Sequence, residues 1–150
     1  MKPSSPLKSL AEFRYQIRRF LDFSRRAARE AGLAPQQHQM LMVIFTGGAG
    51  PDPSIRGLSQ RLFLNHNTAV ELVNRLERKG LARRIPHPTD GRRVSVGITP
   101  RGRRILTRLA RHHFAELRNE GPDLIRALRA VMRGARRVAG PRKRTRRPRH

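Results

Sequence analysis

Apolar residues recur every three or four positions in the first part of the chain, a spacing typical of an amphipathic helix. This spacing predicts a helix over residues 7–31, ended by Gly32. Pro35 suits a first helical turn and begins a second predicted helix, which runs through MLMVIF to Gly47. Because that run is apolar on nearly all sides, we expect this helix to be central and buried.

Two shorter helices and a hairpin are predicted next. Ser54 is a good N-cap for IRGLSQRL, and Asn65 can cap the longer segment that Gly80 ends as a left-handed cap. Two strands, 82–86 and 94–99, are joined by the turn TDGRR, in which Asp-Gly is a strong hairpin signal.

The pattern returns to helix at Thr99-Pro100, a cap followed by a favourable first residue. The apolar stripe of this helix continues to about residue 119, where Gly121-Pro122 is expected to break it, and a short final helix follows. Residues 134–150 include RKRTRRPRH, which cannot build a core, and are expected to form a disordered basic tail.

Charge is the strongest compositional signal. The 150 residues include 34 Lys and Arg against 10 Asp and Glu, a net charge of +24. A field of this size favours polyanions such as nucleic acid, although a merely solubilising surface is the alternative. The tail holds only a minority of the basic residues, so the folded part is basic without it.

Several classes of protein are disfavoured by composition. The chain has no cysteine, which excludes disulfides, thiolate metal sites and thiol redox sensors. It has no apolar run long enough for a membrane span and no secretory h-region, so we expect a cytoplasmic protein without a membrane partner. It also lacks a phosphate-binding glycine loop, paired carboxylates and a nucleophile with a base, so neither an enzyme nor a cofactor is expected.

A short helix, a turn, a longer helix and a two-stranded hairpin are the elements of a winged helix-turn-helix. The predicted fold class is therefore mainly α with a small β-hairpin wing. In such proteins the second helix of the pair enters the major groove and the hairpin reaches along the duplex. Arg92 and Arg93 at the hairpin tip can enter a narrow minor groove or clamp phosphates, with Asp90 holding the tip in shape.

Three segments resemble the MarR family of bacterial regulators: GLAPQQHQML, LSQRLFLNHNTAVELVNRLERKGLARR and DGRRVSVGITPRGRR. They span residues 32 to about 106. The combination of LERKGL, D-G-R-R and an I-T-x-x-G helix start is more specific than a generic helix-turn-helix pattern.

The resemblance implies a MarR-like domain over residues 1–133, with a reading head at about 34–99. It also implies a homodimer held by interlocking dimerisation helices at about 7–31 and 100–133. Members regulate transcription, usually as repressors, on pseudo-palindromic double-stranded DNA, and many release it when a small organic effector binds. Two departures are that Ala34 replaces the usual hydroxyl cap and that the final helix is short, which predicts a smaller dimer interface.

The outward face of the fourth predicted helix carries the candidates for DNA contact. Asn67 and Asn74 can bond adenine in bidentate fashion, and Val70 can touch a thymine methyl. The hydroxyl and basic side chains suit phosphates, and Glu71 is outward without an assigned contact. The alternative is a solvated helix face. The predicted DNA-binding set on this helix is His66, Asn67, Thr68, Val70, Asn74, Arg75 and Arg78.

Two effector hypotheses concern the predicted helices outside the wing. An organic effector would occupy a pocket lined by Phe13, Ile17, His38, Met42 and His113. No metal is expected, because lone histidines are usually structural and the donor set lacks cysteine. The zinc alternative would use His38, His112 and Glu116.

A rival function and the role of the tail stay open at the sequence level. A sequence-indifferent nucleic-acid-binding or nucleoid-associated protein would explain the charge equally well. RNA binders usually present stacking aromatics, whereas the aromatic residues here lie mainly on apolar helix faces. The tail is either a DNA tether, which would steepen the salt dependence of binding by about 0.9 per phosphate neutralised, or a solvated end.

Overall fold

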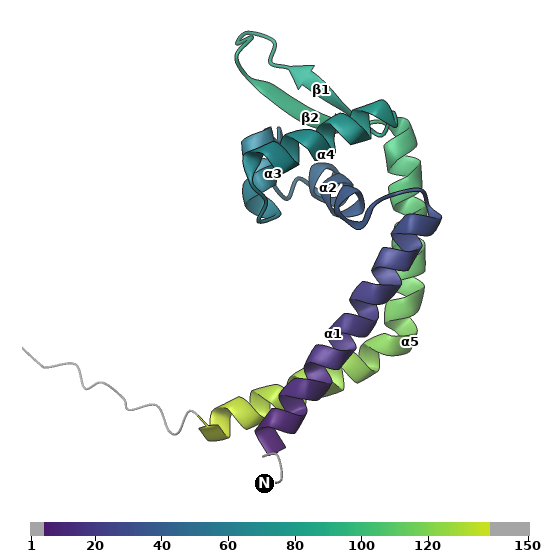
Figure 1. Ribbon diagram of the computed structural model, residues 1–150, viewed down its shortest axis with the longest axis vertical. Helices are drawn as coiled ribbons and strands as arrows, with labels where there is room; N and C mark the ends of the chain where they lie inside the picture. The colour runs from purple at the N-terminus through teal and green to yellow at the C-terminus, as the bar shows by residue number, and fades with distance from the viewer. Residues whose placement is uncertain (1–4, 139–150) are drawn as a thin grey trace, which may run out of the picture. The chain divides into compact units, whose positions relative to one another are not determined.

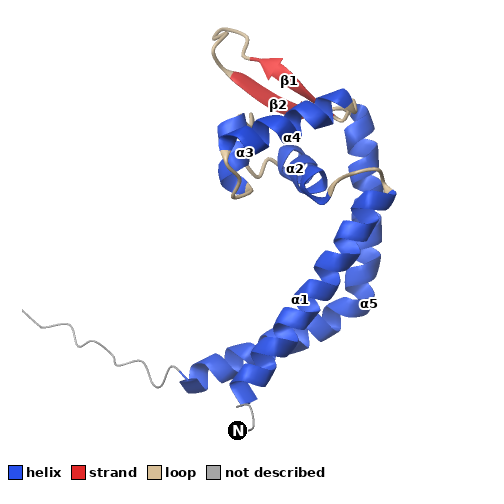
Figure 2. Ribbon diagram, in the orientation of Figure 1, coloured by secondary structure: helices blue, strands red, loops and turns tan. Residues whose placement is uncertain are grey.

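The computed structural model describes residues 5–138, which fall into two compact units. The first unit comprises the chain up to Phe23 together with the chain from Ala115 onward, and the second comprises Ser24–Phe114. The element order is α1 (Ser5–Glu30), α2 (Pro35–Thr46), α3 (Ile55–Arg61), α4 (His66–Arg78), β1 (Ala82–Pro86), β2 (Val94–Ile98) and α5 (Pro100–Val138) (Figure 1). The fold is mainly α with one two-stranded antiparallel hairpin, as predicted (Figure 2).

The core of the second unit is built around α2. Met40 and Leu41 of α2 are fully buried, and they belong to one apolar cluster with Leu58 of α3 and Leu76 of α4. The prediction of a central, buried second helix is therefore confirmed. The exposed side chains of the helix are Gln36 and Gln39 and, in its last turn, Phe45 and Thr46.

The predicted helix caps of this unit are present. Ser54 accepts a hydrogen bond from the Gly57 amide (3.1 Å), and Asn65 Oδ1 accepts one from the Thr68 amide (2.8 Å). At α2, Ala34 provides no side-chain cap, as expected, but Gln37 Oε1 accepts a hydrogen bond from the Ala34 amide (3.0 Å). Half of a capping box therefore compensates for the missing hydroxyl.

The wing consists of β1, β2 and the turn between them, and Figure 1 shows it projecting from the helices of its unit. The strands pair antiparallel, with Ala82 opposite Ile98 and Pro86 opposite Val94. Buried Val96 donates its amide to the Pro53 carbonyl (2.9 Å). This bond anchors the base of the wing to the loop that precedes α3.

The start of α5 explains the I-T-x-x-G motif. Thr99 Oγ1 donates to the Gly80 carbonyl (2.7 Å) and accepts from the Gly102 amide (3.0 Å), while the Thr99 amide donates to the Leu81 carbonyl (3.1 Å). Gly102 is buried so close to this backbone that an added Cβ would overlap the Leu81 carbonyl oxygen. Threonine and glycine thus seat the first turn of α5 against the end of α4.

The predicted break at Gly121-Pro122 is wrong, because α5 is one helix of 39 residues that contains Pro122. A helix-internal proline removes one hydrogen bond and costs about 3 kcal/mol. Residues on both sides of it make tertiary contacts or are buried. Glu120 forms an ion pair with Arg19 of α1 (2.5 Å), and Ala127 is 5% exposed. There is accordingly no short final helix, and the smaller interface inferred from it has no basis.

The predicted boundary of the tail also moves. Residues 134–138, expected to be disordered, form the last turns of α5. The rest of the predicted tail, 139–150, lies outside the described residues.

Phe63, in the turn between α3 and α4, is 97% exposed and has a φ of 55°. This left-handed conformation costs a residue with a Cβ about 1–2 kcal/mol, and exposure leaves little packing to offset it. We expect Phe63→Gly to raise the free energy of unfolding by only up to about 1 kcal/mol. Relief of the backbone strain stabilises the variant, but the greater entropy of glycine in the unfolded chain offsets part of this gain. Urea denaturation tests this, and a loss of stability would show that the ring makes a compensating contact.

Candidate nucleic-acid interface

The outward face of α4 presents the residues predicted for DNA contact at different depths. His66, Asn67, Arg75 and Arg78 are exposed, whereas Thr68, Val70 and Asn74 are half-buried. The inward residues Ala69, Leu72, Val73 and Leu76 are buried and fix the rotation of the helix. The structure therefore places all seven predicted side chains on the solvent side of that buried stripe.

Asn74 is tied to the wing by a network that the sequence did not reveal. Its Oδ1 accepts a hydrogen bond from Arg84 Nη2 of β1 (2.9 Å). The guanidinium of Arg84 also forms an ion pair with Glu77, whose Oε1 accepts the Arg84 amide (2.8 Å). Because arginine only donates, the amide orientation of Asn74 is fixed. Its oxygen already accepts one bond, so the expected bidentate bonding to adenine would have to use the remaining lone pair of that oxygen together with the NH2 group.

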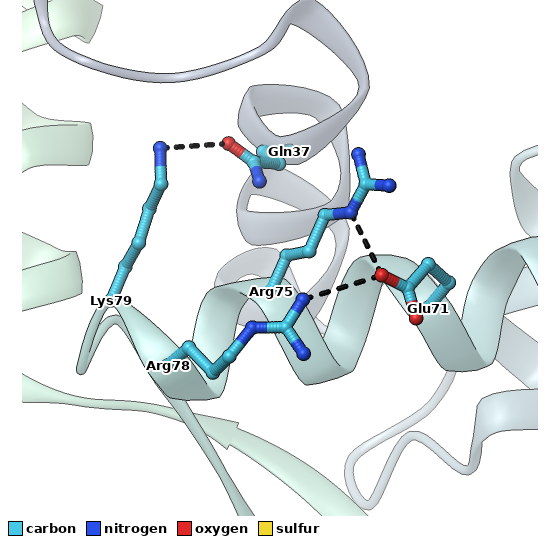
Figure 3. A network of polar contacts seen from close by, with 5 residues as sticks. All are labelled: Gln37, Glu71, Arg75, Arg78 and Lys79. Atoms are coloured by element: carbon cyan, nitrogen blue, oxygen red, sulfur yellow. Dashed lines mark hydrogen bonds and ion pairs between the residues drawn. The ribbon is translucent and has the colours of Figure 1, made fainter.

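Arg75 and Arg78 share one carboxylate. Glu71 Oε1 receives Arg75 Nε at 2.9 Å and Arg78 Nη2 at 3.3 Å (Figure 3). The hydrogen bonds from Arg75 and then Arg78 hold the pKa of Glu71 below its usual value. The two predicted phosphate contacts are thus held by an acidic side chain of the same helix.

The wing tip carries its arginines outward. Arg92 and Arg93 are exposed, and within the described residues neither guanidinium forms an ion pair. Asp90 Oδ1 accepts the Arg92 amide and the Asp90 carbonyl accepts the Arg93 amide, both at 3.0 Å. His87 Nδ1 accepts the Asp90 amide (3.2 Å). Asp90 thus bonds to the backbone of the turn, as a residue that holds the wing tip in shape would.

The predicted effector residues are divided between the two units. Phe13 and Ile17 belong to the first unit, and His38, Met42 and His113 to the second. Within the second unit the rings of His38 and His113 lie 5.1 Å apart. The pocket as a whole stays a prediction.

The zinc alternative finds no support in the described part of the chain. No group of three or more His, Asp or Glu side chains there could hold a metal ion. His38 neighbours His113 rather than forming such a group with His112, and Glu116 belongs to the other unit.

His38 is a buried base. It is 4% exposed, and its Nε2 has no hydrogen-bond partner within the described residues. His113 Nδ1 lies 2.7 Å from the Leu109 carbonyl and therefore donates to it, so in the neutral ring Nε2 accepts from the Ser24 hydroxyl (2.9 Å). Burial, followed by repulsion from His113, lowers the pKa of His38 from its ordinary 6.5.

We expect acid to destabilise the protein through His38. Because the pKa is lowered in the fold, the unfolded chain binds more protons once the pH falls below about 6.5. The stabilisation is complete above that pH and is lost as the pH falls toward the folded pKa, with a slope of at most about 1.4 kcal/mol per pH unit. Urea unfolding between pH 7.5 and 5 should show a flatter dependence for His38→Leu than for the unmodified chain. The exposed His112→Gln should keep the original slope, and equal slopes for all three would refute this assignment.

The described geometry defines a winged helix-turn-helix protein. Residues 31–93 match the model of the MarR family. A transcriptional regulatory protein for the hcr operon of Thauera aromatica is 35% identical over 96 residues, which cover 64% of this chain and 56% of that protein. The HTH-type transcriptional regulator YsmB of Bacillus subtilis is 27% identical over 107 residues, covering 69% of this chain and 71% of YsmB. The similarity to the MarR family model is confined to less than half of the chain, and the chain spans only a little over half the length of the Thauera relative.

Solved structures agree on the fold. RV1404 from Mycobacterium tuberculosis has a TM-score of 0.71 at 20% identity, covering 89% of this chain and 96% of that one. A mutant of MepR from S. aureus bound to an oligodeoxyribonucleotide has a TM-score of 0.65 at 18% identity, covering 82% of this chain and 94% of that one. No helix among the described residues is both long and apolar enough to cross a bilayer.

Proposed function

We propose that this protein is a DNA-binding transcriptional regulator, acting as a repressor in the bacterial cytoplasm. The observation that carries the proposal is the pairing of an exposed, polar α4 face with two exposed arginines at the wing tip that form no ion pair within residues 5–138. In a winged helix-turn-helix these two elements contact the major groove and the adjoining backbone or minor groove. The family match and the DNA-bound MepR mutant support the same proposal.

The proposed operator is pseudo-palindromic because the proposed regulator is a homodimer. In the first unit, α1 and α5 leave apolar side chains exposed that a second copy would cover. The exposed set is Leu7, Leu10, Leu21, Ile125, Leu128 and Met132. Analytical ultracentrifugation should find a dimer at micromolar concentration. A small organic effector that releases the DNA is a further part of the proposal, and it rests on the family resemblance.

The test is fluorescence anisotropy with DNA from the protein's own upstream region against a scrambled duplex of equal length. Because α5 extends to Val138, the full chain should be compared with a chain ending there. A preference for the upstream duplex that persists at physiological salt supports the regulator. Equal binding of both duplexes and RNA, lost with salt or with the tail, would support the sequence-indifferent alternative instead.

A further inference from the structure

Glu71 stands out on the outward face of α4. The other acidic residue of this helix, Glu77, is turned to the wing and paired with Arg84. Glu71 lies among the polar and basic residues proposed to face DNA and is itself exposed. A bare carboxylate at this position would be repelled by phosphates, so its presence on the reading surface calls for a physical reason.

The arginines remove that repulsion without using the whole carboxylate. The bonds that Glu71 receives from Arg75 and Arg78 both end on Oε1 (Figure 3). Glu71 to Arg75 is an i,i+4 pair in the favourable order, acid before base. Neither of these bonds uses Oε2, which remains an acceptor carried on a side chain whose position the two arginines restrict.

Oε2 can only accept a hydrogen bond, which narrows the bases that it can recognise. In the major groove the donors are the amino groups of cytosine and adenine. Adenine places its N7 acceptor beside its amino group, which disfavours a carboxylate, whereas cytosine offers its amino group without that neighbour. Acidic side chains accordingly pair with cytosine in direct readout.

We propose that Glu71, held by Arg75 and Arg78, is a specificity-determining residue that selects a cytosine in each half-site of the operator. This inference rests on the proposed function, since it needs α4 to enter the major groove. Arg75 and Arg78 then act as positioning residues for Glu71, and their remaining N–H groups stay available for phosphates. The carboxylate in turn offsets part of the positive charge of the two arginines, which limits attraction to DNA of the wrong sequence.

In vitro selection from randomised duplexes tests the proposal, using the full chain and the Glu71→Gln variant. Glutamine keeps the size of the side chain but loses the charge and presents both a donor and an acceptor. The unmodified protein should select sites with a fixed cytosine in each half-site. Replacing that C·G pair should weaken its binding about ten-fold or more, but should weaken the binding of Glu71→Gln much less. The variant should also bind scrambled duplex more tightly.

Glu30→Gln is the matched control, because it makes the same change in charge at an exposed position in the last turn of α1. It should keep the selected cytosine, and thermal midpoints should show that both variants fold. If Glu71→Gln selects the same bases as the unmodified protein, Glu71 only stabilises the helix and the inference is wrong while the regulator stands. If the unmodified protein selects no sequence, the proposed function and this inference fail together.

Discussion

Gly102→Ala should lower the free energy of unfolding by about 3 kcal/mol, at the upper end of overpacking costs in well-packed cores. The added methyl would overlap the Leu81 carbonyl oxygen and lie 2.9 Å from Ile98 Cγ1. A clash with backbone cannot be relieved by a change of rotamer. Relief requires the first turn of α5 to move away from the end of α4, which would break the bonds made by Thr99. Urea unfolding at a fixed protein concentration measures the loss, because oligomers change stability with concentration.

Gly121→Ala provides the comparison within the same helix. An added Cβ at Gly121 meets no atom within 4 Å. Its gain in helix propensity, about 1 kcal/mol, is opposed by the restriction that Pro122 places on the preceding residue. We expect a change within about 1 kcal/mol of zero. A similar small effect for Gly102→Ala would mean that the start of α5 packs more loosely than described.

Arg92→Ala combined with Arg93→Ala should weaken binding to the upstream duplex by about 100-fold near physiological salt, if each arginine supplies about 1–1.5 kcal/mol. The two guanidinium groups are exposed and have no ion-pair partner in the described residues, so their removal leaves no buried charge behind. The backbone bonds of Asp90 keep the tip in shape without them. The salt dependence should become shallower by up to about 1.8, two phosphate contacts for duplex DNA.

Arg136→Ala combined with Arg137→Ala removes the same charge from the last turn of α5, where both residues are exposed. It should change the affinity only slightly, through the overall field. Unaltered binding by the wing variant, or an equal loss in both double variants, would contradict a specific contact made by the wing.

Local chemistry predicted most of the fold. Ser54, Asn65 and Gly80 act where they were expected, because caps depend on a few neighbouring backbone groups. The strands were located to within one residue, since Asp-Gly restricts the turn between them. The helix break predicted at Pro122 was wrong because non-local contacts, and not local ones, decide the structure there. A proline carries a local penalty, whereas the tertiary contacts of this part of the helix, such as that of Arg19 with Glu120, join residues about 100 positions apart.

The sequence predicted which residues lie on the proposed interface, but not the hydrogen bonds and ion pairs that they form. Periodicity alone placed Asn74, Arg75 and Arg78 on the outward face of α4. The residues to which these side chains bond could not be predicted from periodicity. Arg84 reaches Asn74 only because β1 lies beside α4. The pattern of apolar residues does not specify this placement of the strand.

Lys79, at the end of α4, donates to Gln37 Oε1 of α2 (3.4 Å, Figure 3). It also donates to the carbonyl of Gly32, which lies between α1 and α2 (2.6 Å), so its ammonium group holds this connection. Arg84 is likewise committed to Glu77. The formal charge of the chain therefore overstates its effective valence toward a polyanion. The number of counterions displaced on binding should fall well short of the number of basic side chains around α4. Modification of Lys79 should destabilise the packing of α4 against the start of α2 more than it weakens binding to phosphates.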